Sequence, residues 1–192
     1  RLRMRAGGHL QELLARLRDP AACEPLDGRP LHGTLRSYQR TGADWLGFLS
    51  GLGLGACLAD DMGLGKTLQA LALLQARVCA KPSVPSLIVL PASLLSNWKA
   101  EIARFAPDLK ALYLHPSELD RAGLDAAREA RGRHDVVLTT YGMLTRSPWL
   151  TEVAWDLAIL DEAQAIKNPS ARQTRAVKAL KSRARIALTG TP

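Results

Sequence analysis

The stretch Asp60-Asp61-Met62-Gly63-Leu64-Gly65-Lys66-Thr67 follows a short apolar run at 56–59 and opens an amphipathic run that continues to residue 79. A phosphate-binding loop requires this context, with a strand before it and a helix after it. The two glycines let the backbone turn tightly and approach phosphate oxygens, while N–H groups at the helix N-terminus attract the anion. Every residue from Asp60 to Thr67 is therefore a candidate for nucleotide binding.

The end of this stretch carries the groups expected to act on the phosphates. Lys66 would reach the β- and γ-phosphates, and the hydroxyl of Thr67 would ligate Mg²⁺. The stretch departs from the pattern G-x-x-x-x-G-K-[ST] at its first position, where Asp60 stands in place of Gly. Taken alone, the motif has a plainer alternative, which is a surface turn before a helix.

A second signal follows the apolar run 157–160, which ends in the adjacent acids Asp161 and Glu162. A strand here would deliver both carboxylates to the edge of the sheet where the phosphate loop also ends. Asp161 can then hold Mg²⁺, and Glu162 can orient and deprotonate the attacking water. The alternative is a solvated acidic turn. The two motifs together predict nucleotide hydrolysis, with Lys66, Asp161 and Glu162 as its catalytic residues.

Strand and helix patterns alternate along the chain from residue 34. We expect strands at 56–59, 87–90, 111–114, 136–140, 157–160 and 186–189, and helices at 34–50, 66–79, 93–105, 119–131 and 170–181. Thr34 and Ser93 are the expected N-caps of two of these helices. The strand runs are continuously apolar, which is typical of strands buried on both faces. The prediction is an α/β fold with a mostly parallel sheet and helices on both faces.

Two other features bear on the organisation of the chain. An amphipathic helix is expected at 9–18, followed by a linker that contains several Pro and Gly residues. We therefore take 1–33 as an accessory segment and 34–192 as the domain proper.

The run 51–56 satisfies the dinucleotide pattern G-x-G-x-x-A, but that pattern needs a strand before it and a helix after it. Here the order is reversed, so we interpret it as a helix-to-strand connection.

The bulk composition limits the function classes. The chain has 192 residues, of which 47% are hydrophobic and 23% charged, and this balance is typical of a globular domain. No apolar run is long enough to cross a bilayer, so no membrane partner is expected. Cys23, Cys57 and Cys79 show no C-x-x-C spacing, which favours a reducing intracellular compartment over a disulfide framework or a zinc site. The net charge of +8 favours a polyanionic partner such as nucleic acid.

The motifs, in their order along the chain, resemble those of the Swi/Snf-type, superfamily-two helicase-like ATPases. The resemblance covers about 35–192 and includes an acid at the first position of the phosphate loop. Its segments are an adenine-sensing segment from Leu35 to Leu46, motif I at 58–67, motif Ia at 87–98, motif Ib at 139–141, motif II at 161–168 and motif III at 188–192.

The resemblance implies a RecA-like ATP-binding lobe that acts with ATP and Mg²⁺ on double-stranded DNA. It also implies a second RecA-like lobe of the same full-length chain with ATP between the two, so that this fragment alone is expected to be inactive. Gln39 would read the adenine base, and Gln164, Thr189 and Gly190 would couple hydrolysis to movement. Many relatives have His where Gln164 stands, and Gln cannot titrate near neutral pH.

The resemblance places motifs Ia and Ib along the phosphate backbone, which makes Asn97, Lys99, Thr140 and Tyr141 candidates for contacts with nucleic acid. Trp98 is more typical of core packing than of a base-stacking platform. A further basic set could attract DNA, and a solvated helix face explains it equally well. Its members are Arg172, Arg175, Lys178, Lys181, Arg183 and Arg185.

The leading hypothesis is therefore the ATP-binding lobe of a DNA translocase, a helicase-like ATP hydrolase. The alternatives are a strand-separating DNA or RNA helicase and a nucleotide-gated interaction module. The place of action would be the cytoplasm, in association with the nucleoid, or the nucleus if the source is eukaryotic.

Overall fold

The computed structural model describes residue 8 and residues 25–80, 82 and 84–190, so the helix expected at 9–18 lies outside the described residues. Within them, six parallel strands form one sheet in the order β1-β6-β5-β2-β4-β3. The strands are β1 Ala56–Leu58, β2 Ser86–Leu90, β3 Ala111–Leu114, β4 Val136–Thr140, β5 Ala154–Leu160 and β6 Lys181–Leu188. Every neighbouring pair is parallel, which confirms the predicted fold class.

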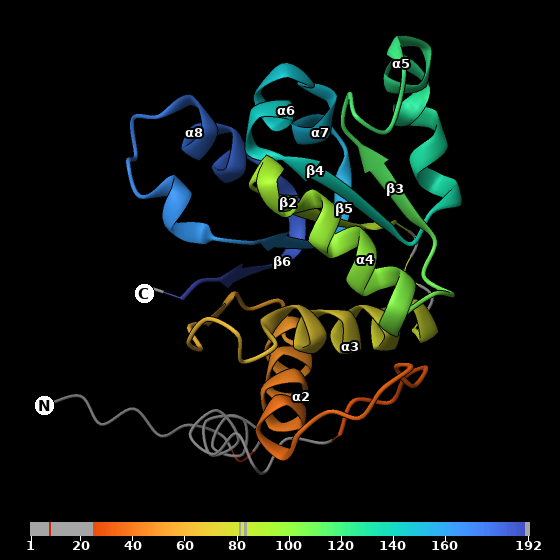
Figure 1. Cartoon of the computed structure of the whole chain (residues 1–192). Coiled ribbons are helices and arrows are strands. Elements are labelled where there is room, and N and C mark those ends of the chain that lie inside the picture. The colour runs from red at the N-terminus through yellow and green to blue at the C-terminus, as the bar shows by residue number, and fades with distance from the viewer. Residues whose placement is uncertain (1–7, 9–24, 81, 83, 191–192) are drawn as a thin grey trace, which may run out of the picture.

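Helices cover both faces of this sheet (Figure 1). They are α2 Ser37–Gly51, α3 Lys66–Cys79, α4 Leu95–Phe105, α5 Arg121–Ala130, α6 Tyr141–Arg146, α7 Trp149–Glu152 and α8 Arg172–Ala179. Strand β2 shows how the faces are divided. Ile88 and Leu90 belong to a core with α2, α3 and α4, whereas Leu87 and Val89 belong to a core with α5, α6, α7 and α8. Burial on both faces explains why the strand runs are continuously apolar.

Some of the observed helices and strands have the predicted bounds, and others begin or end at different residues. Helix α3 and strand β4 have the predicted bounds. Helix α2 begins later than predicted, with Arg36 rather than Thr34 at its N-cap, because the side-chain oxygen of Gln39 accepts the Arg36 N–H at 2.9 Å. Ser93 does not cap α4, because it lies inside a separate 3₁₀ turn, η2 Ala92–Leu94.

The connection between α2 and β1 is the helix-to-strand turn expected for the glycine-rich run. Gly51 ends α2, and Gly53 adopts a left-handed conformation with φ of 73°. Strand β1 then begins at Ala56. A dinucleotide fingerprint is therefore excluded at this position, since helix α2 and not a strand leads directly into it.

Residues 26–32 pack against the domain. The backbone N–H of Leu26 donates to Asp44 Oδ1 at 2.7 Å on α2, and that of His32 donates to the Phe105 carbonyl at 2.8 Å. Leu26 and Leu31 also pack against the core of α2, α3 and α4. The boundary between an accessory segment and the domain proper stays a prediction.

Candidate active site

The phosphate loop between β1 and α3 has the backbone shape that its glycines predict. Gly63 and Gly65 adopt φ angles of 83° and 80°, a region that other residues enter only with strain. Gly65 is also crowded, because a Cβ added there would lie 2.4 Å from Gln39 Nε2. Helix α3 begins immediately afterwards at Lys66, so its N-terminus faces the loop.

The charged groups of the loop are held by contacts within the protein. Lys66 Nζ donates to the carbonyl oxygens of Asp60 at 2.7 Å and Asp61 at 3.0 Å. The Asp60 carboxylate turns toward α3 and accepts a hydrogen bond from Gln69 Nε2 at 2.9 Å. This contact gives Asp60 a role that the Gly of the general pattern could not fill. It ties the start of the loop to the helix that follows.

Gln39 contacts the phosphate loop directly. Its side chain is buried and donates through Nε2 to the Leu64 carbonyl at 3.0 Å. The Tyr38 hydroxyl donates to the same carbonyl at 3.2 Å, a contact that no motif in the sequence indicates. Base recognition by Gln39 stays a prediction, and the structure adds that Gln39 supports the loop from α2.

The acids of the second motif lie at the end of β5, as predicted. Asp161 is 7% exposed, and its carboxylate accepts from Trp98 Nε1 at 2.7 Å and from the Glu162 N–H at 2.9 Å. Burial raises the pKa of Asp161, and the Trp98 hydrogen bond limits this rise. Glu162 has a φ of 49°, a strained left-handed conformation for a residue other than glycine. Such strain is concentrated at functional sites.

One cavity of about 440 Å³ brings the two motifs together. It is lined by Met62, Gly63, Gly65, Lys66, Thr67, Leu68, Leu94, Asn97, Trp98, Glu101, Arg104, Phe105, Asp161 and Glu162. The predicted catalytic residues therefore share one hollow, together with the predicted metal ligands Thr67 and Asp161. Glu101 and Arg104 are additions that sequence reasoning missed, although both lie within two turns of the motif Ia residues.

The predicted coupling residues form a connected path beside this cavity. Gln164 Nε2 donates to Glu162 Oε2, and Thr189 Oγ1 donates to Gln164 Oε1 at 2.8 Å. Gly190 lies next to the loop, since a Cβ there would approach Met62 Cγ at 3.0 Å and Lys66 Nζ at 4.0 Å. The amide at position 164 thus bridges Glu162 to the end of β6 without a titrating group.

The four candidates for nucleic-acid contact lie in different surroundings. Asn97 lines the cavity of about 440 Å³, and Lys99 pairs with Glu118 and lies 5.4 Å from the centre of the Tyr113 ring. Thr140 Oγ1 caps α6 by accepting the Met143 N–H at 3.2 Å.

Tyr141 is buried, and its hydroxyl donates to the Asp161 carbonyl at 2.8 Å. Burial raises the pKa of Tyr141 well above the usual range. Its hydroxyl is therefore engaged with motif II rather than directed to solvent. Thr140 and Tyr141 also line a separate cavity of about 400 Å³. Contact with nucleic acid stays a prediction for all four candidates.

Two ambiguous sequence features have clearer structural explanations. Trp98 is 2% exposed, so the core-packing interpretation is confirmed, with the additional bond to Asp161. In the basic set, Lys181, Arg183 and Arg185 donate to backbone carbonyls of the protein. The remaining three members, on α8, are exposed.

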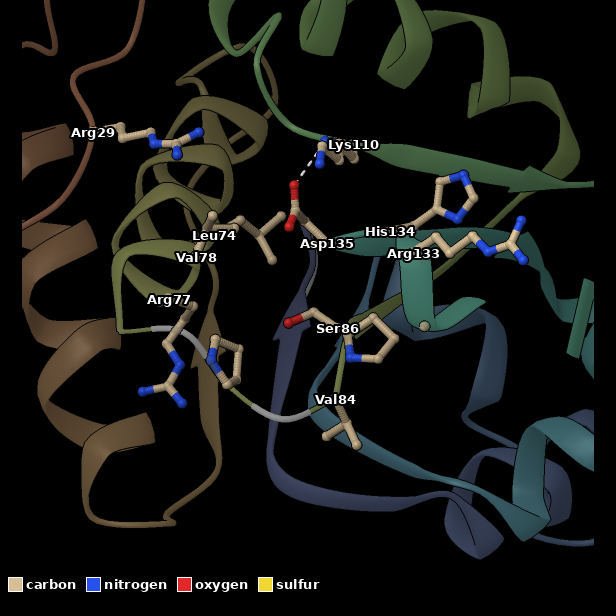
Figure 2. Close-up of a pocket in the computed structure, with 13 residues that line it drawn as sticks. Arg29, Leu74, Arg77, Val78, Val84, Ser86, Lys110, Arg133, His134 and Asp135 are labelled. Carbon is tan, nitrogen blue, oxygen red and sulfur yellow. Dashed lines mark hydrogen bonds between the residues drawn. The ribbon is translucent and has the colours of Figure 1, made fainter. Parts of the chain in front are cut away.

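A larger cavity, of about 540 Å³, lies at the opposite edge of the sheet, where β2 and β4 begin (Figure 2). Its cations include Arg77 in the last turn of α3, which pairs with Asp156 at 2.6 Å, and Arg133 in the turn that follows α5. Cations at helix C-termini offset the partial negative charge there. Its described lining residues include neither a glycine loop nor a pair of acids, so the hollow that contains Lys66 and Asp161 is the candidate active site.

The parallel sheet with a glycine loop between β1 and α3 is the architecture of a P-loop nucleoside triphosphatase domain. A family model described as SNF2-related domain matches residues 38–192. The chain belongs to this SNF2-related family, which confirms the resemblance to Swi/Snf-type ATPases.

Individual relatives agree with this assignment. The chain is 47% identical over 162 residues to the putative ATP-dependent helicase/translocase YwqA of Bacillus subtilis, covering 83% of this chain and 17% of that protein. It is 41% identical over 170 residues to the chromatin-remodeling ATPase INO80 of Arabidopsis thaliana, covering 83% of this chain and 11% of that one. The chain therefore spans less than a fifth of the length of these relatives.

A solved structure, the Sulfolobus solfataricus SWI2/SNF2 ATPase core in complex with dsDNA, matches with a TM-score of 0.78 and 43% identity. The match covers 88% of this chain and 34% of that chain.

In the described part of our chain, no helix combines the length and the apolar character needed to cross a membrane.

Proposed function

We propose that the chain is the ATP-binding lobe of an ATP-dependent DNA translocase that acts on double-stranded DNA. The observation that carries the proposal is the single cavity shared by Lys66, Thr67, Asp161 and Glu162. A phosphate loop alone would support nucleotide binding, but a carboxylate pair in the same hollow supports hydrolysis. The phosphate loop and the carboxylate pair are suited to ATP, and ATP is also the nucleotide that the family uses.

The residues of the cavity have separate roles in this proposal. The N–H groups of residues 63–67 cradle the phosphates, and Lys66 exchanges its two carbonyl partners for phosphate oxygens. Glu162, held by Gln164, orients and deprotonates the attacking water. The strained backbone at Glu162 fixes where this carboxylate points.

The donor set around Thr67 and Asp161 fits Mg²⁺, a cation that prefers hard oxygen ligands and keeps several waters. A hydroxyl and a buried carboxylate line the same cavity and supply such oxygens. We assign the ion to these two residues. When bound, Mg²⁺ would neutralise charge on the β- and γ-phosphates.

Duplex DNA is the proposed polymer. The net charge of +8 favours a polyanion, and the Sulfolobus relative is described in complex with dsDNA. We propose that Asn97, Lys99, Thr140 and Tyr141 lie near the phosphate backbone and read no sequence. A second lobe of the full-length protein would close on the ATP from the other side.

The proposed place of action is the DNA of the cell, which is the nucleoid in a bacterium or the nucleus in a eukaryote.

The test is the ATPase rate of the full-length protein without polymer and with duplex DNA, single-stranded DNA or RNA. We expect duplex DNA to stimulate the rate most. Equal stimulation by single strands, or a preference for RNA, would favour a strand-separating helicase. ATP binding with no turnover under any of these conditions would favour a nucleotide-gated interaction module.

A further inference from the structure

Helix α4 carries two side chains that reach the two proposed Mg²⁺ ligands. Trp98 and Glu101 are three residues apart, so they lie on the same face of the helix. Trp98 Nε1 donates to Asp161 Oδ2 at 2.7 Å. Glu101 lines the same cavity as Thr67, and the nearby Thr67 side chain offsets part of the rise that burial causes in the pKa of Glu101. All of these residues line the nucleotide cavity.

The contact between Trp98 and Asp161 fixes one oxygen of a buried carboxylate. Trp98 is 2% exposed and Asp161 7% exposed, so water does not compete for the bond. The Glu162 N–H holds the other carboxylate oxygen at 2.9 Å. Hydrogen bonds to an ionised acceptor are among the strong ones, particularly away from water. The indole and the amide together set the rotation of the carboxylate.

Glu101 acts on the second ligand from the next turn of α4. Its carboxylate is half-buried, in a cavity that already contains Asp161 and Glu162. An apolar residue could fill this position without placing a third acid beside Asp161 and Glu162. A carboxylate beside Thr67 can instead accept the hydroxyl proton, which leaves the lone pairs of that hydroxyl for a cation.

We propose that Trp98 and Glu101 are positioning residues that hold Asp161 and Thr67 ready for Mg²⁺, so that α4 is a support for the metal site. The proposal rests on the assignment of Mg²⁺ to this cavity in the proposed function. Partners that orient metal ligands change metal affinity by about 10- to 100-fold when they are removed.

The decisive experiment compares Trp98→Phe with Trp155→Phe. Trp155 is a matched control, because it is also 2% exposed and its Nε1 donates at 2.8 Å to the Leu150 carbonyl, which belongs to the other core. Each variant keeps an aromatic ring and loses one buried N–H donor. Calorimetry with the full-length protein measures ATP affinity in Mg²⁺ and in EDTA, and the ratio gives the metal-dependent gain.

We expect Trp98→Phe to lower the metal-dependent gain about tenfold and to leave the EDTA affinity unchanged. Trp155→Phe should lower the melting temperature to a similar extent without changing the gain. If both variants behave alike, or if Trp98→Phe weakens binding equally in EDTA, the residue is only a packing residue. Loss of metal-dependent binding in the wild type would instead contradict the proposed function itself.

Two further experiments test whether each residue acts through its ligand. In an Asp161→Asn background, Trp98→Phe should cause no further loss of the metal-dependent gain, and an additive loss would overturn the proposal.

Glu101→Ala should lower the metal-dependent gain, while Glu101→Gln should restore part of it because an acceptor oxygen remains. Glu129→Ala, an exposed acid on α5, is the charge-matched control. An effect of Glu129→Ala as large as that of Glu101→Ala would assign the result to net charge.

Discussion

The hydroxyl of Thr189 donates to Gln164 Oε1 at 2.8 Å and so joins the end of β6 to the turn that follows β5. The Thr189 N–H also donates to the Leu58 carbonyl of β1 at 3.1 Å, next to the phosphate loop. Because Gln164 in turn holds Glu162, the hydroxyl is two hydrogen bonds from the proposed general base. Two of the predicted coupling residues, Gln164 and Thr189, thus have a physical connection to the proposed site of hydrolysis.

We predict that Thr189→Val separates ATP binding from DNA stimulation. Valine keeps the shape but removes the donor, and one lost hydrogen bond corresponds to about 0.5–1.5 kcal/mol. ATP affinity should stay close to that of the wild type, while the DNA-stimulated rate should fall roughly 2- to 10-fold. Thr151→Val on α7 is the control, since the Thr151 hydroxyl donates at 2.8 Å to the carbonyl of Pro148, the N-cap residue. Equal effects of the two substitutions would argue against coupling through Thr189.

Lys66→Ala should strongly weaken binding of Mg²⁺-ATP. The substitution removes the cation that would contact the phosphates, and charge-assisted hydrogen bonds are each worth roughly 1.5–3 kcal/mol. We expect affinity to fall by about one to two orders of magnitude in calorimetric titrations. Lys178→Ala removes an exposed charge from α8 and should leave binding unchanged. If the two variants bind ATP equally well, the phosphate loop has been assigned wrongly.

Glu162→Gln should keep nucleotide binding and lose hydrolysis. The amide preserves the shape of the side chain but cannot accept the proton of the attacking water. A positioned general base contributes about 10²- to 10⁴-fold to rate, which sets the expected loss in phosphate release. Calorimetry on the same sample should give a wild-type ATP affinity. Substantial turnover by this variant would exclude Glu162 as the base.

Much of the site could be predicted because its motifs are local in the sequence. The phosphate loop, α3 and the acids after β5 each occupy a short continuous stretch, and the parallel sheet requires the carboxyl ends of its strands to share one edge. This topology places Lys66 and Asp161 in one cavity without any knowledge of side-chain packing.

The parts that could not be predicted depend on contacts between distant residues. The bond from Trp98 to Asp161 joins residues 63 positions apart, and that from Tyr38 to Leu64 joins residues 26 positions apart. No local pattern encodes such pairs. Helices α6 and α7 are also absent from the predicted elements, because segments of six and four residues are too short to show a helical period.

The two left-handed glycines of the loop should differ in their tolerance of alanine. Gly63 has a φ of 83° with nothing within 4 Å of an added Cβ, so Gly63→Ala should cost only the backbone strain, about 1–2 kcal/mol. Gly65→Ala has similar strain and also places a Cβ 2.4 Å from Gln39 Nε2. Urea unfolding should therefore show a larger loss for Gly65→Ala, together with weaker ATP binding.

Gly132→Ala provides the reference for this pair. Nothing lies within 4 Å of its added Cβ, and Gly132 is not among the positive-φ glycines of the described chain. Its free energy of unfolding should change little. Equal losses for Gly63→Ala and Gly65→Ala would show that Gln39 does not restrict the loop.

The ion pair between Lys99 and Glu118 gives a specific prediction about DNA binding. Both side chains retain some exposure, and an exposed pair is worth little, so a phosphate can compete for the lysine. Lys99→Ala should weaken binding of duplex DNA uniformly across sequences and reduce the slope of log K against log salt by about 1. Glu118→Gln should have the opposite effect on affinity, because it releases the lysine and removes a negative charge near the DNA. Fluorescence titrations at several salt concentrations, on two duplexes of unrelated sequence, measure both effects. If Lys99→Ala leaves the salt slope unchanged, or if Glu118→Gln weakens binding, Lys99 does not contact a phosphate and the DNA path must lie elsewhere on the lobe.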